Sequence, residues 1–166
     1  MNKDEEIAAF AAVANELLTL LESLSEEQIN RVPFPGSWTP GQLAEHLSKS
    51  FGAVDMAKVP SSPLERNAEE KSAQIEAVFL DDGTKYASLD FIAPATGKIS
   101  GKEIIGDLRK KADGVVAFAK THDLSFTCPG FDVIGFGPLT AQEWIHFLTA
   151  HGQRHLRQLR NMVSRA

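Results

Sequence analysis

The sequence predicts an all-α fold, a four-helix bundle in which a long crossover joins the second and third helices. Four segments repeat apolar residues at spacings of three or four, as helices with one buried face require. Capping motifs stand at the starts of several of these segments. Between the second and third segments, residues 60–99 form a long mixed connection. In a helical bundle, such a connection is typical of a crossover from one end to the other.

The composition predicts one soluble domain, residues 1–166, with 43% hydrophobic and 23% charged residues. A net charge of −5 argues against non-specific nucleic-acid binding, which needs basic patches. The polar start of the chain does not resemble a signal peptide. No apolar run reaches the roughly 20 residues of a membrane-spanning helix. The single cysteine, Cys128, excludes an intramolecular disulfide and a cysteine-rich metal site, and fits a reducing cytoplasm.

The first helix is expected over residues 4–24, where three acidic residues, 4–6, suit the helix N-terminus. Residues 25–28 have the pattern of a cap for one short further turn. The apolar face of the first helix consists of Ile7, Phe10, Ala11, Ala14, Leu17, Leu18, Leu21 and Leu24.

The second helix is expected from Pro40 to about Ala57, after a stretch with two prolines and a glycine that excludes a helix. Thr39 suits the N-cap, Pro40 suits the first helical position, and Gln42 completes a capping box. One face of this helix carries a largely apolar stripe that includes a histidine. The stripe consists of Leu43, His46, Leu47, Ser50, Phe51 and Val54.

Within the crossover, residues 67–79 predict a short helix, residues 81–83 a turn, and residues 86–92 an extended segment. The third helix is expected over residues 100–120 and the fourth over residues 140–164. Each begins with a serine or threonine, and a glutamate three positions later completes the pattern of a capping box. Between these two helices, an irregular loop is expected to cover one end of the bundle. Its apolar residues are Phe126, Phe131, Ile134 and Phe136.

The fourth helix carries the main functional signal. His151 and His155 are four positions apart, so their imidazoles lie on one face, one turn apart, where they can share a metal ion. His46 lies on the inward stripe of the second helix. The sequence therefore predicts a three-histidine metal site inside the bundle. The face that carries the histidine pair is otherwise apolar, with Trp144, Phe147, Leu148, Leu159 and Met162.

The chemistry of buried imidazoles favours this prediction. Buried polar groups need partners, and three converging histidines cannot easily satisfy one another. A divalent cation can accept one neutral nitrogen from each of them. An all-imidazole set suits zinc, nickel, copper or iron, and of these we favour zinc or nickel; it does not suit magnesium or calcium. Three protein ligands leave one position open for water or substrate, as in catalytic sites.

The three histidines also have an ordinary structural interpretation, because a buried histidine usually bonds to a carbonyl group. Other polar residues near them are expected to have structural or surface roles. His146 lies off the face of the pair, and we expect it at the surface or behind the ligands. His122 is expected to be solvated. Cys128 is expected to be a buried structural thiol, the alternatives being a fourth ligand or a reactive thiolate. Glu45 diverges from its neighbour His46 around the helix and need not face the metal.

Three larger side chains also have two interpretations each. Arg154 can bind an anionic substrate or form a surface ion pair. Trp38 and Trp144 each stand near a helix start, where core packing is the simpler role and pocket lining the alternative.

Two stretches of the chain resemble the DinB/YfiT-like family of metalloenzymes. They are residues 38–47, WTPGQLAEHL, and residues 151–159, HGQRHLRQL. The resemblance extends to the order and length of the helices over nearly the whole chain. It implies a four-helix bundle with a long crossover, a metal held by His46, His151 and His155, and a homodimer.

The resemblance also implies a range of activities. Members with known chemistry are thiol-dependent transferases and isomerases that use low-molecular-weight thiols, or metal-dependent hydrolases. The implied function is thus an S-transferase or a hydrolase that acts on a small molecule. The alternative is a non-enzymatic metal-binding or stress-response module, in which the metal is structural or absent. No nucleic-acid or membrane partner is expected.

Overall fold

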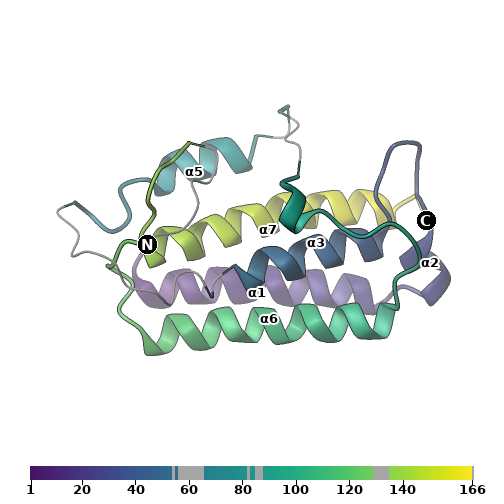
Figure 1. Cartoon of the computed structure of the whole chain (residues 1–166), viewed down its shortest axis with the longest axis horizontal. Coiled ribbons are helices and arrows are strands. Elements are labelled where there is room, and N and C mark those ends of the chain that lie inside the picture. Colours follow the sequence, from purple (N-terminus) through teal and green to yellow (C-terminus); the bar gives the residue numbers. More distant parts are fainter. Residues whose placement is uncertain (54, 56–65, 82, 85–87, 129–134, 166) are drawn as a thin grey trace.

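The structure, a computed structural model, describes residues 1–53, 55, 66–81, 83–84, 88–128 and 135–165. In these ranges the regular elements are helices (Figure 1), so the predicted all-α class is confirmed. A single isolated bridge, between Thr127 and Thr140, is the only β-pairing in the described part of the chain. The elements are α1 (Lys3–Glu22), α2 (Glu26–Asn30), α3 (Pro40–Gly52), α5 (Ser72–Phe79), the 3₁₀ helix η1 (Asp90–Ile92), α6 (Gly101–Thr121) and α7 (Ala141–Val163).

Reciprocal side-chain bonds fix the starts of α3 and α7. Thr39 accepts a hydrogen bond from the backbone N–H of Gln42, and the Gln42 side chain accepts one from the Thr39 N–H. Thr140 and Glu143 form the same pair at the start of α7. These capping boxes satisfy N–H groups that have no partner within the helix. They set the phase of the two helices that carry the histidines.

The predicted helices differ from the structure mainly at their ends. α1 stops slightly before the expected residue 24, and α2 is the expected further turn. α3 ends at Gly52, before the predicted Ala57, which lies outside the described residues. α6 begins with half of its predicted motif, since Ser100 accepts a bond from the Glu103 N–H.

The prediction of an extended segment over residues 86–92 is wrong at the C-terminal end, where the chain forms η1. Residues 86 and 87 lie outside the described part. The Ile92 N–H bonds to the Leu89 carbonyl, and the Ala93 N–H to the Asp90 carbonyl. These local turns satisfy the backbone without a partner strand. In the loop before α7, Phe136 packs against the core, whereas Phe131 and Ile134 lie outside the described residues.

Four long helices, α1, α3, α6 and α7, lie side by side around the core (Figure 1). α1 and α3 each contact both α6 and α7, while α5 lies against α7. Each large apolar side chain that is fully buried contributes about 1.5–3 kcal/mol. The largest of them on these helices are Phe10, Leu17, Leu21, Leu43, Leu47, Phe51, Leu108, Trp144 and Ile145.

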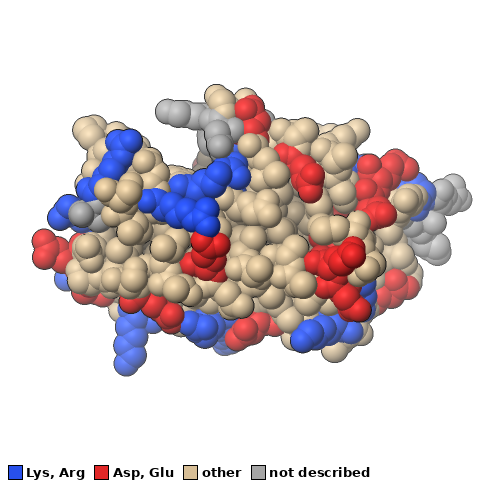
Figure 2. Space-filling model, turned by 180° about the vertical axis from the view of Figure 1, so that it is seen from behind, with Lys and Arg blue, Asp and Glu red and all other residues tan. Residues whose placement is uncertain are grey.

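The surface is charged and mixed. Figure 2 shows acidic and basic side chains spread among uncharged residues on the face turned away from the viewer of Figure 1. None of the helices in the described ranges is long and apolar enough to cross a membrane.

A close approach of α1 and α7 lies directly beside the histidine pair. A Cβ atom added to Gly152 would lie 2.9 Å from Cγ1 of Val13, closer than real Cβ contacts. Glycine at this position therefore lets α1 pack tightly behind His151.

We expect Gly152→Ala to lower the free energy of unfolding by about 1–3 kcal/mol, because overpacking outweighs the better helix propensity of alanine. Gly114→Ala in α6 is the matched control, since nothing lies within 4 Å of an added Cβ there. The free energy of unfolding of that variant should rise by about 0.5–1 kcal/mol. Urea denaturation of both variants measures the difference. An equal gain in both would contradict the close packing of α1 on α7.

Candidate metal site

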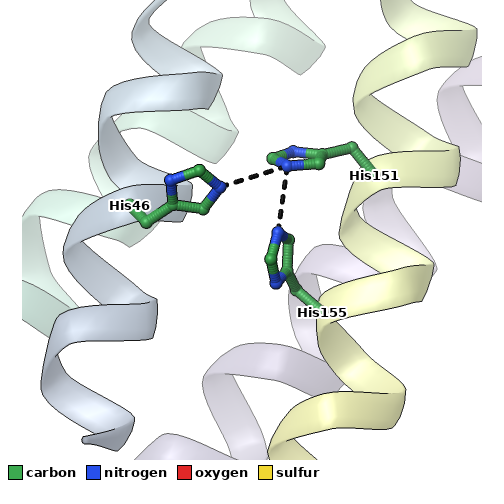
Figure 3. Close-up of side chains that lie close together, drawn as sticks. All are labelled: His46, His151 and His155. Carbon is green, nitrogen blue, oxygen red and sulfur yellow. Dashed lines mark hydrogen bonds between the residues drawn. The ribbon is translucent and has the colours of Figure 1, made fainter. Parts of the chain in front are cut away.

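Three histidines converge between α3 and α7 (Figure 3). Nε2 of His151 lies 3.1 Å from Nε2 of His46 and 3.0 Å from Nε2 of His155. All three side chains are buried, and one ring nitrogen from each lies within 4.8 Å of the others. The structure thus brings together the three residues that the sequence selected, in a group that could hold a metal ion.

Hydrogen bonds at the outer nitrogens orient two of the rings. Nδ1 of His46 donates to the carbonyl oxygen of Ile92 at 2.9 Å, and the Ser88 hydroxyl lies 3.3 Å from the same nitrogen. Nδ1 of His155 donates to Oε1 of Gln158 at 2.9 Å. A carbonyl oxygen can only accept, so both imidazoles carry their proton on Nδ1 and turn an Nε2 lone pair inward.

The inner nitrogens cannot satisfy one another. A neutral His151 has one proton, but two Nε2 lone pairs face its own Nε2. Its Nδ1 is buried and has no hydrogen-bond partner among the described residues. A cation at the centre would remove this conflict, because it would accept a lone pair from each ring. A tetrahedral zinc ion with Zn–N bonds of about 2.05 Å separates its nitrogens by about 3.3 Å, close to the distances found here.

Burial keeps the three imidazoles neutral. It lowers the pKa of His151 well below the usual value, and the neighbouring His155 and His46 lower it further. Burial also lowers the pKa of His155 to about 3. The pKa of His46 is lowered mainly by burial, against the opposing effect of its bond to the Ile92 carbonyl. At neutral pH the three imidazoles are therefore uncharged, as metal binding requires.

The chain is similar to known proteins over most of its length. The sequence model of the DinB superfamily matches residues 9–159. The chain belongs to the DinB superfamily. It is also similar to a Bacillus subtilis (strain 168) protein named "Uncharacterized protein YuaE", with 28% identity over 148 residues, which covers 86% of this chain and 87% of that protein. No solved structure matches the chain.

Aromatic rings surround the histidines of this DinB-superfamily protein. The Trp38 ring lies tilted against His46, with 5.1 Å between ring centroids. Phe147 stacks on His151 at 5.5 Å, and Phe79 of α5 meets the same imidazole edge-on at 5.8 Å. Trp38 therefore packs beside the site, whereas Trp144 is buried in the core.

Other residues considered from the sequence have structural roles. Burial raises the pKa of the Cys128 thiol to about 11, which excludes the reactive thiolate at neutral pH. Glu45 pairs with Lys49 and accepts a bond from the Ala95 N–H, outside the histidine group. Arg154 donates to the backbone carbonyls of Asp81 and Thr84, and so fastens the chain after α5 to α7. His122 is exposed, as expected.

Of the two positions expected for His146, at the surface or behind the ligands, the surface position is wrong. The imidazole is buried between helices, with Nδ1 3.0 Å from Oε1 of Glu6 and Nε2 3.2 Å from Oε1 of Glu76. Glu6 is itself completely buried. No pattern in the sequence indicates this pair, because Glu6 fits the acidic start of a helix equally well.

His146 provides a pH-dependent contribution to stability. Burial alone would lower its pKa, but the hydrogen bond and charge of Glu6, together with Glu76, raise it above the usual value. A folded-state pKa above that of the unfolded chain stabilises the fold fully below about pH 6.5. This stabilisation is lost as the pH rises through the folded-state pKa.

We therefore expect His146→Leu to lower the free energy of unfolding by about 3–5 kcal/mol near pH 6, because it leaves the buried Glu6 carboxylate without its charged partner. The difference from wild type should shrink as the pH rises from about 6 through the raised pKa of His146, because the imidazole of the folded wild type then becomes neutral. Urea denaturation of metal-free protein across this range measures it. His122→Leu, at an exposed position, is the control. A difference that does not change with pH would show that His146 is not charged in the fold.

Proposed function

We propose that this chain is a metal-dependent enzyme in which His46, His151 and His155 hold one divalent transition metal ion, zinc or nickel. The observation that carries the proposal is the convergence of three buried, neutral imidazoles whose inner nitrogens lie 3.0 and 3.1 Å apart. Nitrogen donors alone suit these ions and do not suit magnesium or calcium. Membership of the DinB superfamily supports the same site.

Three neutral nitrogen donors favour an anionic ligand at the remaining coordination position of the proposed ion. Three neutral histidines leave the full charge of a divalent ion uncompensated, and the group contains no carboxylate among the described residues. When bound, the ion would act as a Lewis acid that lowers the pKa of a coordinated thiol or water. A small thiolate or hydroxide would then fill the open position.

Of these two ligands we favour a low-molecular-weight thiol, and hence a thiol-dependent S-transferase. A thiol loses its proton outright on coordination to zinc. This reaction therefore needs no carboxylate base, and the described histidine group contains none. The sulfur would bond to a carbon of the substrate, the leaving group would depart with its electron pair, and the thiol proton would pass to solvent. The apolar rings of Trp38, Phe79 and Phe147 suit an apolar electrophile. Hydrolysis by a bound water is the second enzymatic candidate.

The fold supports a bundle around this site. We propose that α1, α3, α6 and α7 form the four-helix bundle of a single domain, and that the chain between α3 and α6 is its crossover. The side-by-side packing of the four helices supports this arrangement (Figure 1). The crossover then contributes Phe79 and the Ile92 carbonyl to the histidine site.

One observation favours a non-enzymatic alternative, a metal-binding or stress-response module. The three histidines are at most 8% exposed, which also suits a structural ion with a closed shell. The two functions differ in whether the ion accepts an external ligand.

Elemental analysis of the untagged protein tests the site itself. We expect about one zinc or nickel ion per chain, lost in the double variant His151→Ala/His155→Ala, because one histidine cannot hold the ion alone. His122→Ala, at an exposed histidine, should retain the metal. Wild-type protein without metal, even after zinc and nickel are supplied, would rule out the metalloenzyme and leave a helical binding module.

Ligand exchange tests the open position. In cobalt-substituted protein we expect a small thiol such as 2-mercaptoethanol, and separately azide, to change the visible absorption, because either anion enters the metal's coordination shell. Thiol consumption with a panel of alkyl halides and epoxides then tests S-transfer. A spectrum that neither anion changes would support the structural ion instead.

A further inference from the structure

The three histidines differ at the nitrogen that faces away from the site. His46 bonds to a backbone carbonyl, and His151 has no partner among the described residues. His155 bonds to a side-chain amide, Gln158 Oε1, at 2.9 Å. A histidine that ligates through Nε2 must carry its proton on Nδ1, so a group that accepts this proton selects the ligating form of the ring.

Gln158 is well placed to make that selection. It follows His155 by three positions on α7, and residues at this spacing are neighbours on one helix face. The Gln158 side chain is half-buried, whereas His155 is 8% exposed, so water competes little for the bond at the ring.

The other tautomer of His155, with its proton on Nε2, also has a hydrogen-bond acceptor inside the site. Without an acceptor at Nδ1, a buried N–H would be left unsatisfied, which costs about 1–3 kcal/mol. The proton would instead move to Nε2, where Nε2 of His151 lies 3.0 Å away and can accept it. A proton on Nε2 blocks coordination through that nitrogen.

We propose that Gln158 is a positioning residue for the metal: it holds the His155 proton on Nδ1 and keeps the Nε2 lone pair directed at the ion. This inference rests on the proposed metal site, but the hydrogen bond acts in the metal-free protein as well. Gln158 itself does not touch the ion. It acts through the orientation and proton position of one ligand, as outer-shell partners of metal-bound histidines do.

The test compares Gln158→Leu with Gln153→Leu, a matched control at a second half-buried glutamine on the same helix. Long-range ¹H–¹⁵N NMR of the metal-free, histidine-labelled proteins reports which ring nitrogen of His155 carries the proton. We expect the Nδ1–H form in wild type and in Gln153→Leu, and the Nε2–H form in Gln158→Leu. Zinc affinity, measured by competition with a chelating dye, should fall about 10–100-fold in Gln158→Leu alone.

Gln158→Glu separates orientation from packing, because the carboxylate accepts the same bond while the leucine cannot. It should restore the Nδ1–H form and at least wild-type affinity. An Nδ1–H ring in Gln158→Leu, or a zinc affinity equal to that of Gln153→Leu, would overturn the role of Gln158. Wild-type protein that binds no zinc would refute the proposed function instead, and the metal-free NMR comparison would still decide whether Gln158 orients His155.

Discussion

The packing of α3 against α7 is the constraint on which the rest of the site depends. It buries His46 against His151 and His155, so their polar nitrogens lie among apolar side chains of the core. Buried imidazoles need partners, and three inner nitrogens at these distances cannot all find one in each other. The hydrogen bonds at Nδ1 of His46 and His155 increase this conflict, because each directs an Nε2 lone pair inward. A bound cation would resolve it by accepting a lone pair from each ring.

The connection between α3 and α6 is part of the site. η1 brings the Ile92 carbonyl to His46, and α5 places Phe79 against His151. Arg154, one position before His155, fastens the turn after α5 through two backbone carbonyls. These contacts give the connection a structural role, as is usual for a connection of this length.

Helical periodicity and capping chemistry act locally, so the sequence could predict the helices and the inward histidines. The spacing of four on α7 fixes the relation of His151 to His155. The acceptor at His46 could not be predicted, because it is a backbone oxygen in a segment without periodicity. Glu6 was missed for a different reason: its pairing partner, His146, lies at the other end of the sequence, and only tertiary packing brings the two helices together.

Two histidine environments on α7 show how the neighbours of a side chain decide its chemistry. His146 and His151 are similarly buried on the same helix, yet the pKa of the first is raised and that of the second is lowered. The difference lies in the facing groups, a buried carboxylate from α1 for His146 and two further imidazoles for His151. A charged imidazole cannot ligate a cation, whereas a neutral one can. Burial alone therefore does not decide the charge of a histidine. Among the described residues, the carboxylates of Glu6 and Glu76 beside His146 raise its pKa, whereas the groups that act on His151 lower its pKa.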